Sequence, residues 1–435
     1  MARTPSRRAG TPLALRADVR HWLIGLSVLA ALGRLPGEAV VYAQEAQEPR
    51  KEPERPRERA PRGGRIGRIA AAMTGEDQPV RPLAGVVVPG SGFAAGVALE
   101  APTVADTPWG IGGEGLWSIR DYRHLLVRAG RLDGRRGLPA IRAADSAITS
   151  MMEEGRAHAA GLAWFVEHRY RSLPTLSFFG HDEAGTARTD YGVSRTTTDA
   201  VVQWRASGSR LGFSGRVGFM RTDTFAGRDP HRVDTVERFG RAFDGGGVAD
   251  TRYVTMGVGA LVDHRSKRPR PAGGWLAQAT VTGYRGASGA SPSFVRTALD
   301  VRGFRPMGPA RHTLAARLLA SADVAARGHG VPAYLQQTLG GTNSLRGYTS
   351  YRLRGRRLVH ATVESRWQIY HRLDVVPFVD AGAVGRSPID QGLHGVIVSP
   401  GIGLRVKHKG RSIGRLDLAH GREGTRVSFD VGGPF

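Results

Sequence analysis

The segment VHATVESRWQI, at residues 359–369, decides the fold class because apolar and polar residues alternate along it. Side chains of an extended strand point alternately to its two faces. Val359, Val363 and Trp367 therefore share one face, whereas Glu364 and Arg366 share the other. The same alternation recurs at residues 211–219, 254–262, 295–302 and 396–407. Strands with one apolar face and one polar or glycine-rich face are typical of transmembrane β-barrels.

A soluble β-sandwich is the alternative fold, since its strands also alternate and bury their apolar faces in a shared core. The number of such segments, the mean hydropathy of −0.27 and the chain's last residue, Phe435, favour the barrel. At about 20–25 residues for each strand with its connection, residues 80–435 accommodate about 14 to 18 strands, and bacterial single-chain barrels have an even number. We therefore predict an all-β fold, a transmembrane antiparallel β-barrel of about 16 strands.

The N-terminal region indicates export from the cytoplasm. Arginines precede an apolar run at residues 22–32, and Val41-Tyr42-Ala43 fits the small-x-small pattern of a signal cleavage site. The apolar run is shorter than the roughly 20 residues that a membrane-spanning helix needs. Residues 44–68 are rich in Pro, Glu and Arg and have too few apolar side chains to form a core. We predict a signal peptide at residues 1–43 and a disordered periplasmic linker at residues 44–79.

Composition excludes several classes of function. The chain has no cysteine, which excludes disulfides, thiolate metal sites and cysteine nucleophiles. A net charge of +24 is typical of nucleic-acid-binding proteins. However, the arginines are scattered without a basic stripe, and the export signal separates the protein from nucleic acid, so we predict no nucleic-acid partner. Arginines near the barrel rims are instead expected to meet outer-membrane lipids and lipopolysaccharide.

No catalytic constellation stands out in the sequence. Residues 110–115, GIGGEG, fit the G-x-G-x-x-G spacing, but they lie between alternating segments and indicate a glycine-rich hairpin rather than a nucleotide site. A G-x-S-x-G elbow is absent, and His181-Asp182-Glu183 is typical of a polar loop. The histidines do not cluster at the spacing of metal ligands. We predict no catalytic residue, no metal and no cofactor, and we do not expect an enzyme.

The run LGGTNSLRGY, at residues 339–348, has the composition of a loop, since Gly, Asn and Ser favour turns. An arginine in such a loop, here Arg346, is normally solvated and dispensable. The competing hypothesis is that the loop folds inward and that Arg346 pairs with a carboxylate. Glu364 and Asp380 are the candidate partners because each lies in the middle of an alternating segment. Strand parity places Glu364 on the polar face of its strand and puts Asp380 on the same face as Phe378 and Gly382.

These motifs resemble, in their order along the chain, those of the BamA/TamA-like outer-membrane assembly barrels, also called the bacterial surface antigen family. The pieces that carry the resemblance are Arg346-Gly347-Tyr348, Glu364-Ser365-Arg366, Phe378-Val379-Asp380-Ala381-Gly382 and residues 415–420 with the terminal strand. Residues 176–180 and Asp190-Tyr191 are similar to markers of the family's early strands. Phe429 and Phe435 resemble the C-terminal signal by which such barrels are recognised for assembly.

The resemblance implies a 16-stranded barrel in the bacterial outer membrane whose sixth extracellular loop folds into the lumen, where Arg346 contacts Glu364 and Asp380. It also implies that the protein assists the insertion or translocation of proteins at the outer membrane. Its partners would then be client proteins and a separate periplasmic partner, because the family's periplasmic repeat domains are not recognised here. The alternative is a passive channel or a structural surface barrel that keeps the loop contact without insertase activity.

The family further implies a weakly paired seam between the first and last strands. We predict the first strand at residues 85–93, where Pro89 removes a ladder donor and glycines weaken the pairing. The end of the chain also carries Gly432, Gly433 and Pro434. Both terminal strands would thus pair weakly, which is consistent with a seam that opens. The alternative is that these residues form a mere bulge or turn.

Overall fold

The computed structural model describes the residues from Val80 to Asp430, with gaps. The described ranges are 80–88, 90–101, 109–131, 161–180, 188–206, 210–229, 231–240, 250–266, 273–287, 291–308, 311–327, 330–385, 395–408 and 411–430. The predicted signal peptide, the predicted linker and Phe435 lie outside these ranges, as do Pro89 and the loop at His181.

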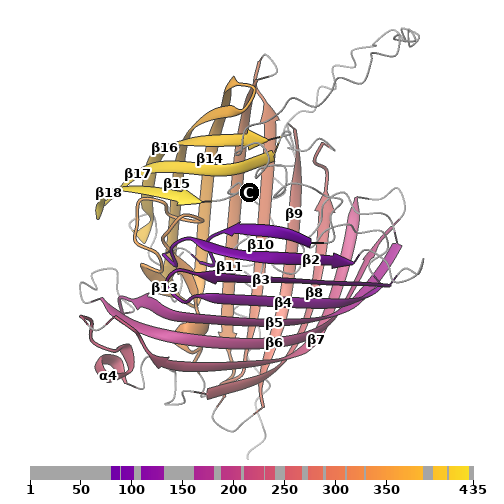
Figure 1. The fold of residues 1–435 in the computed structure, drawn as a ribbon, viewed down its shortest axis with the longest axis vertical. Coiled ribbons are helices and arrows are strands. Elements are labelled where there is room, and N and C mark those ends of the chain that lie inside the picture. Colours follow the sequence, from indigo (N-terminus) through magenta and orange to yellow (C-terminus); the bar gives the residue numbers. More distant parts are fainter. Residues whose placement is uncertain are drawn as a thin grey trace, which may run out of the picture. The chain divides into compact units, whose positions relative to one another are not determined.

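Sixteen strands form one antiparallel sheet, which confirms the predicted fold and strand number. Neighbours in the sheet follow one another in the chain, except that β11 pairs with β14 across a long connection. The strands are β1 Val80–Gly85, β2 Ala94–Ala101, β3 Trp109–Ser118, β4 Arg123–Arg131, β5 Gly161–Phe178, β6 Thr189–Arg205, β7 Leu211–Ala226, β8 Asp250–Asp263, β9 Gly274–Gly286, β10 Phe294–Pro306, β11 His312–Ala325, β14 Arg357–Tyr370, β15 Leu373–Gly385, β16 Ile397–His408, β17 Arg411–Gly421 and β18 Gly424–Asp430. The sheet curls into a nearly closed barrel, so that β2 and β17 both lie on the near side of the view, in front of β10 and β11 (Figure 1).

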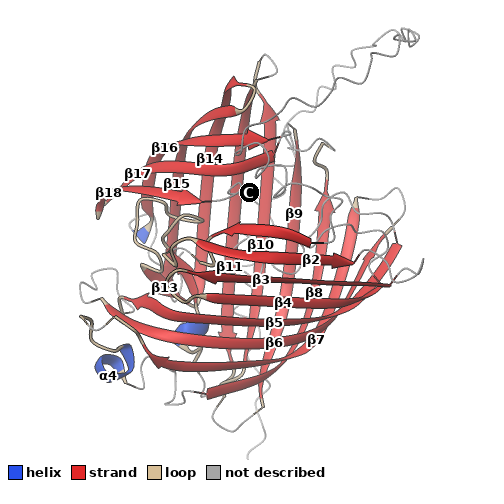
Figure 2. Cartoon of the chain, viewed as in Figure 1, coloured by secondary structure: helices blue, strands red, loops and turns tan. Residues whose placement is uncertain are grey.

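Helices are a minor part of the structure (Figure 2). They include α4 Thr235–Phe239, between β7 and β8, and the 3-10 helix η1 Ala333–Leu335, between β11 and β14. No helix in the described ranges is long and apolar enough to cross a membrane. A separate two-stranded sheet, β12 Gln337–Leu339 with β13 Leu353–Gly355, lies in the same connection as η1. We call this connection, residues 326–356, the inward loop, and the end of the barrel that bears it the loop end.

The alternation predicted from the sequence separates an outer apolar face from an inner polar face. On β14, Val363 and Trp367 are 47% and 50% exposed, whereas Glu364 is fully buried. Ten residues separate the outward-facing Trp367 and Arg357 along this strand, a rise of about 34 Å. At a strand tilt of about 40°, this rise gives an apolar band about 26 Å tall, close to the roughly 25 Å of outer-membrane barrels.

Tryptophans lie at the end of this apolar band that is remote from the inward loop. Five of them face outward where their strands meet the end of the barrel remote from the inward loop, namely Trp109, Trp164, Trp204, Trp275 and Trp367. Several stack against a neighbouring ring, as Trp204 does against Phe213 and Trp367 against His312. Aromatic rings of this kind sit at the membrane–water interface. The ring of tryptophans therefore places one interface of the membrane at this end of the barrel.

The structure corrects two expectations about local structure. The predicted first strand at residues 85–93 is wrong, because β1 ends at Gly85 and β2 begins only at Ala94. The Ser91 hydroxyl accepts hydrogen bonds from the Val87 and Val88 N–H groups and closes a turn there. The G-x-G-x-x-G segment at residues 110–115 is also not a hairpin, since it lies within β3 and pairs along its length with β4.

Candidate functional site

The tip of the inward loop is a compact turn that carries Arg346 into the barrel. The Ser344 hydroxyl accepts a hydrogen bond of 2.9 Å from the N–H of Gly340. Gly341 donates its N–H to the carbonyl oxygens of Leu345 and Tyr348. Gly340 and Gly341 have φ values of +114° and +93°, a region that favours glycine. The glycines of the motif thus allow the chain to reverse twice within a few residues.

Arg346 lies between β14 and β15 and contacts both carboxylates that the sequence nominated. Its Nε and Nη2 donate to the two carboxylate oxygens of Asp380 at 2.8 and 2.7 Å, a bidentate pair. Its Nη1 donates to Oε1 of Glu364 at 2.8 Å. Its guanidinium carbon lies 3.3 Å from the ring centroid of Phe378, a cation–π contact. The side chain of Arg346 is only 2% exposed, so these contacts replace water almost completely.

The contacts of Arg346 belong to a larger network, which we call the anchor network. Glu364 also receives a hydrogen bond from Arg366, and Arg405 lies 3.5 Å from it. Asp417 on β17 accepts from Arg405 and lies 3.9 Å from Arg346. The network comprises four carboxylates, of Glu364, Asp380, Asp417 and Asp430, and four guanidinium groups, of Arg346, Arg366, Arg405 and Arg415.

This balance of charge explains how so many ions lie in a site with little water. An unpaired buried charge is very unfavourable, whereas a paired and hydrogen-bonded one is tolerated. Burial disfavours the charged form of Arg346, but its hydrogen bonds to Asp380 and the nearby carboxylates raise its pKa above the usual value. The guanidinium therefore stays charged at any physiological pH.

The residues after Arg346 fit against β16 and β17. The N–H of Gly347 donates to the Ser399 hydroxyl at 2.7 Å. A Cβ added at Gly347 would lie 2.5 Å from both this hydroxyl and the carbonyl oxygen of His420, so only glycine allows the approach. Tyr348 is 5% exposed, and its hydroxyl accepts from the N–H of Arg422.

A second contact region fixes the inward loop near the end of β17 that lies at the loop end of the barrel. Glu423, in the turn between β17 and β18, accepts hydrogen bonds from the N–H and hydroxyl of Thr349 and from the guanidinium of Arg352. Burial alone would raise the pKa of Glu423, but the hydrogen bonds from Thr349 and Arg352 lower it by more. The pKa of Glu423 is therefore below its usual value. The carboxylate form therefore favours the docked loop.

A third contact region, on other strands, was not anticipated from the sequence. Arginines hold the three successive carbonyl oxygens of η1: Arg354 donates to Ala333, Arg195 of β6 donates to Tyr334 at 3.3 Å, and Arg296 of β10 donates to Leu335. The Tyr334 hydroxyl also donates to Thr251 of β8 at 3.1 Å. The inward loop is thus attached to β6, β8 and β10 as well as to β14–β17.

Apolar side chains fill the space around η1. They form a buried cluster of residues from the loop and from the inner faces of β2, β3 and β5–β10, which includes Leu173, Phe178, Tyr191, Tyr253, Tyr284, Phe294, Val331, Tyr334 and Leu335. A smaller cluster packs Leu339, Leu345 and Tyr348 against Leu358 and Ile397. The loop end of the barrel is therefore packed with side chains rather than lined by polar groups.

The structure thus brings together the residues of the predicted loop motif and its partner carboxylates. Phe378 lies under Arg346, and a Cβ at Gly382 would lie 2.8 Å from a methyl carbon of Leu339 and 3.0 Å from the carbonyl oxygen of Val359, which favours a glycine there. Phe429 lies apart from this site, on the outer face of β18, where it is 61% exposed. Within the described ranges, no group of three His, Asp or Glu side chains could hold a metal ion.

Sequence reasoning missed Asp417, Arg405 and Arg415 as members of the network. The signal that could have found them is strand parity, because all three occupy inward positions of β16 and β17. The carbonyl contacts of η1 had no such signal, since they depend on backbone geometry within a loop.

The fold and the site together define an outer-membrane β-barrel with an arginine-anchored inward loop. The Omp85 superfamily domain matches residues 169–432, more than half of the chain, and the protein belongs to this superfamily. Omp85 barrels are bacterial outer-membrane proteins, and this protein is located there. Outer-membrane barrels have short periplasmic turns and longer extracellular loops, so the end that bears the long connection between β11 and β14 is the cell-surface end.

Two solved structures show the same fold. BamA from Haemophilus ducreyi lacking POTRA domains 1-3 is 14% identical, with a TM-score of 0.56 over 81% of this chain and 69% of that chain. CdiB from Escherichia coli is 13% identical, with a TM-score of 0.52 over 82% of this chain and 63% of that chain. The match thus spans less than two thirds of CdiB. The comparison with curated proteins gave no match.

Proposed function

We propose that this barrel assists the insertion or translocation of proteins at the outer membrane by offering a free strand edge to a client protein. The observation that carries the proposal is that the two edge strands of the sheet are unpaired. The strand order runs from β1 to β18, and these two strands do not pair with each other within the described ranges. An unpaired strand edge presents N–H and C=O groups that can add another strand.

Both edge strands are poorly suited to closing the barrel permanently. β1 has six residues and β18 has seven, against 18 for β5. Pro82 lies within β1, opposite Val97 of β2. Proline has no N–H to donate and is tolerated in a strand only where that side lacks a partner. Pro82 therefore deprives the free edge of β1 of a donor near its middle, which supports a seam that opens.

The anchor network supports the same proposal because of where it lies. Apart from Arg346 of the inward loop, its members occupy β14, β15, β16, β17 and β18, the strands next to the free edge. These contacts would keep the C-terminal side of the barrel in shape while a client strand adds to the free edge. A client that adds to such an edge would be an extended segment of an unfolded outer-membrane β-protein, delivered by a separate periplasmic partner.

A passive channel is the alternative function. The buried aromatic cluster around η1 argues against it, since apolar side chains fill the loop end of the barrel. Ion conductance in planar bilayers separates the two, because a channel conducts and a barrel with a packed mouth does not. No catalytic step forms part of the proposal.

The test is to join the edges and measure protein assembly. The chain has no cysteine, so introduced pairs react without background. Ala84→Cys in β1, combined with Thr425→Cys or Val427→Cys in β18, joined by a bifunctional maleimide, should reduce the levels of other β-barrels in the outer membrane. The matched control is Ala84→Cys with Ala95→Cys, which joins β1 to its existing neighbour β2. Unchanged barrel levels in the edge-joined protein would refute the proposal.

A further inference from the structure

A row of polar side chains faces the lipid at the cell-surface end of β5–β8. Tyr170 of β5, Thr196 of β6, Arg221 of β7 and Arg252 of β8 stand opposite one another in register, each on the outer face of its strand. Arg285 of β9, opposite Val254, lies diagonally next to Arg252 on the same face. Arginines from three adjacent strands therefore meet at one place on the outer surface.

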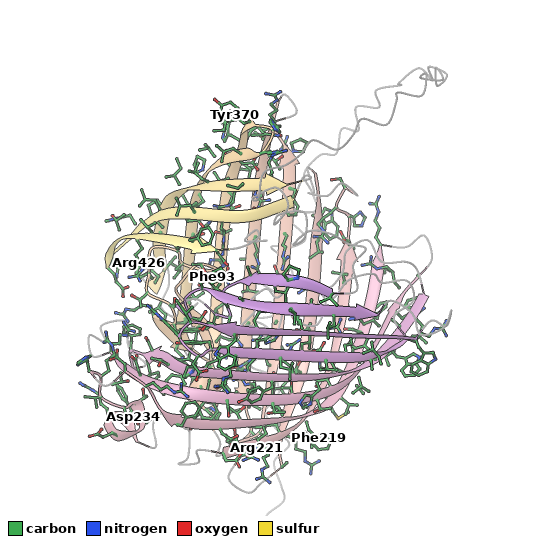
Figure 3. All side chains as sticks on the ribbon, in the orientation of Figure 1. Phe93, Phe219, Arg221, Asp234, Tyr370 and Arg426 are labelled. Atoms are coloured by element: carbon green, nitrogen blue, oxygen red, sulfur yellow. The ribbon has the colours of Figure 1, made fainter. Side chains whose placement is uncertain are left out.

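The place lies at the upper border of the apolar band. Towards the membrane centre, the next outward-facing pair on β7 and β8 is Phe219 with Val254. Met256 follows Val254 on the outer face of β8. Phe219 and Met256 are 67% and 65% exposed. Figure 3 shows both Phe219 and Arg221 projecting away from the ribbon of β7. Arg221 and Arg252 thus occupy the height at which acyl chains give way to headgroups.

The internal partners of these arginines are incomplete. Asp223 contacts Arg221 at 3.1 Å, and Asp250 contacts both Arg221 and Arg252 at 3.2 Å. For the side chain of Arg285, the described ranges contain neither a hydrogen bond nor an ion pair. Three guanidinium groups therefore share two carboxylates, and the side chains of Arg221 and Arg252 remain 55% and 60% exposed.

Like charges directly opposite each other in a sheet are destabilising unless another group compensates them. Arg221 and Arg252 form such a pair, and Asp250 compensates it only in part, because Arg221, Arg252 and Arg285 together carry one charge more than Asp223 and Asp250. Guanidinium groups at adjacent strand positions can both donate to the oxygens of one phosphate, and the hydroxyls of Thr196 and Tyr170 extend the row of donors. Anionic headgroups attract arginines near a membrane surface.

We propose that Arg221, Arg252 and Arg285 form a binding site for the phosphate of a phosphorylated glycolipid in the outer leaflet, with its acyl chains lying against Phe219 and Met256. The site is separate from the anchor network and from the free edges of the sheet. It would fix the orientation and depth of this side of the barrel in the membrane, on the side away from the β1–β18 seam.

The experiment titrates the full purified chain in detergent micelles with lipid A that carries its phosphates, and counts bound lipid by native mass spectrometry. Arg221→Gln, Arg252→Gln and Arg285→Gln should each weaken binding about fivefold, and the triple variant about a hundredfold. Lipid A without phosphate should bind the wild-type chain as weakly as phosphorylated lipid A binds the triple variant.

Two matched controls separate a defined site from general attraction. Arg305→Gln removes an exposed outer-face arginine at the opposite end of β10, and Arg357→Gln removes one at the cell-surface end of β14. Both should leave binding unchanged. Equal losses in Arg357→Gln, or no loss in the triple variant, would overturn the site. Inorganic phosphate that competes as strongly as lipid A would show a free-anion site and overturn the assignment to a lipid.

Discussion

Replacing Arg346 tests how firmly the inward loop is held. Arg346→Met removes the charge but keeps much of the side-chain volume above Phe378. Glu364 keeps Arg366 and Arg405 as partners, so most of the loss falls on Asp380. Asp380 is fully buried, and within the described ranges its remaining side-chain donor is the hydroxyl of Thr362. Leaving a buried carboxylate without its cation costs about 3–5 kcal/mol, and we expect a destabilisation of this size.

The loss is measured by urea unfolding in lipid vesicles, followed by tryptophan fluorescence and by heat-modifiable migration on gels. Protease cleavage within the inward loop should rise in parallel. Arg422→Ala is the control, since only the backbone N–H of Arg422 contacts the loop. Arg346→Met combined with Asp380→Asn should recover a large part of the stability, because a neutral amide is far less unfavourable when buried alone. A loss below about 1 kcal/mol, or a double variant as unstable as the sum of its parts, would refute the reasoning.

Three further predictions concern the other contacts of the inward loop. Gly347→Ala should destabilise by about 1–3 kcal/mol through its clash with the backbone of His420, whereas Gly303→Ala, which has nothing within 4 Å, should be neutral in the same unfolding assay. Arg296→Gln should expose residues 327–336 to protease, because it releases η1; unchanged cleavage would contradict this. The lowered pKa of Glu423 means that its stabilising effect is present above about pH 4.5 and is lost as the pH falls through its lower folded-state pKa. Loop cleavage by an acid-tolerant protease should therefore rise in that range, and Glu423→Gln should remove this dependence.

The alternation of residues was enough to predict the barrel, because outward and inward positions face lipid and lumen respectively. The strand number of about 16 came instead from the length of residues 80–435 and from the even strand count of such barrels. Strand parity also placed Glu364 and Asp380 on inward faces, where the structure has both. The first strand could not be placed this way. Residues 86–88 are apolar, as in a strand, but hydrogen bonds from their backbone to the hydroxyl of Ser91 form a turn there. Periodicity reports which face a residue occupies, but it does not report local side-chain-to-backbone bonds.

The parts of the site that sequence reasoning missed share a different cause. Arg405 and Asp417 belong to β16 and β17, and only the registers of β14 to β17 bring Arg405 within reach of both Glu364 and Asp417. The arginine contacts of η1 involve backbone oxygens, which every residue has, so no side-chain pattern marks them. Register and backbone direction are properties of the folded barrel.

The most direct test of the proposed function asks what touches the free edge of β1 in a living cell. A photo-crosslinking residue at position 84 of β1 should capture newly made outer-membrane β-proteins, through segments that become strands in their folded barrels. The same residue at position 258, which faces lipid in the middle of β8, should capture none. Capture of such segments at position 84 alone is the result that the proposal predicts, and equal capture at both positions, or none at position 84, would contradict it.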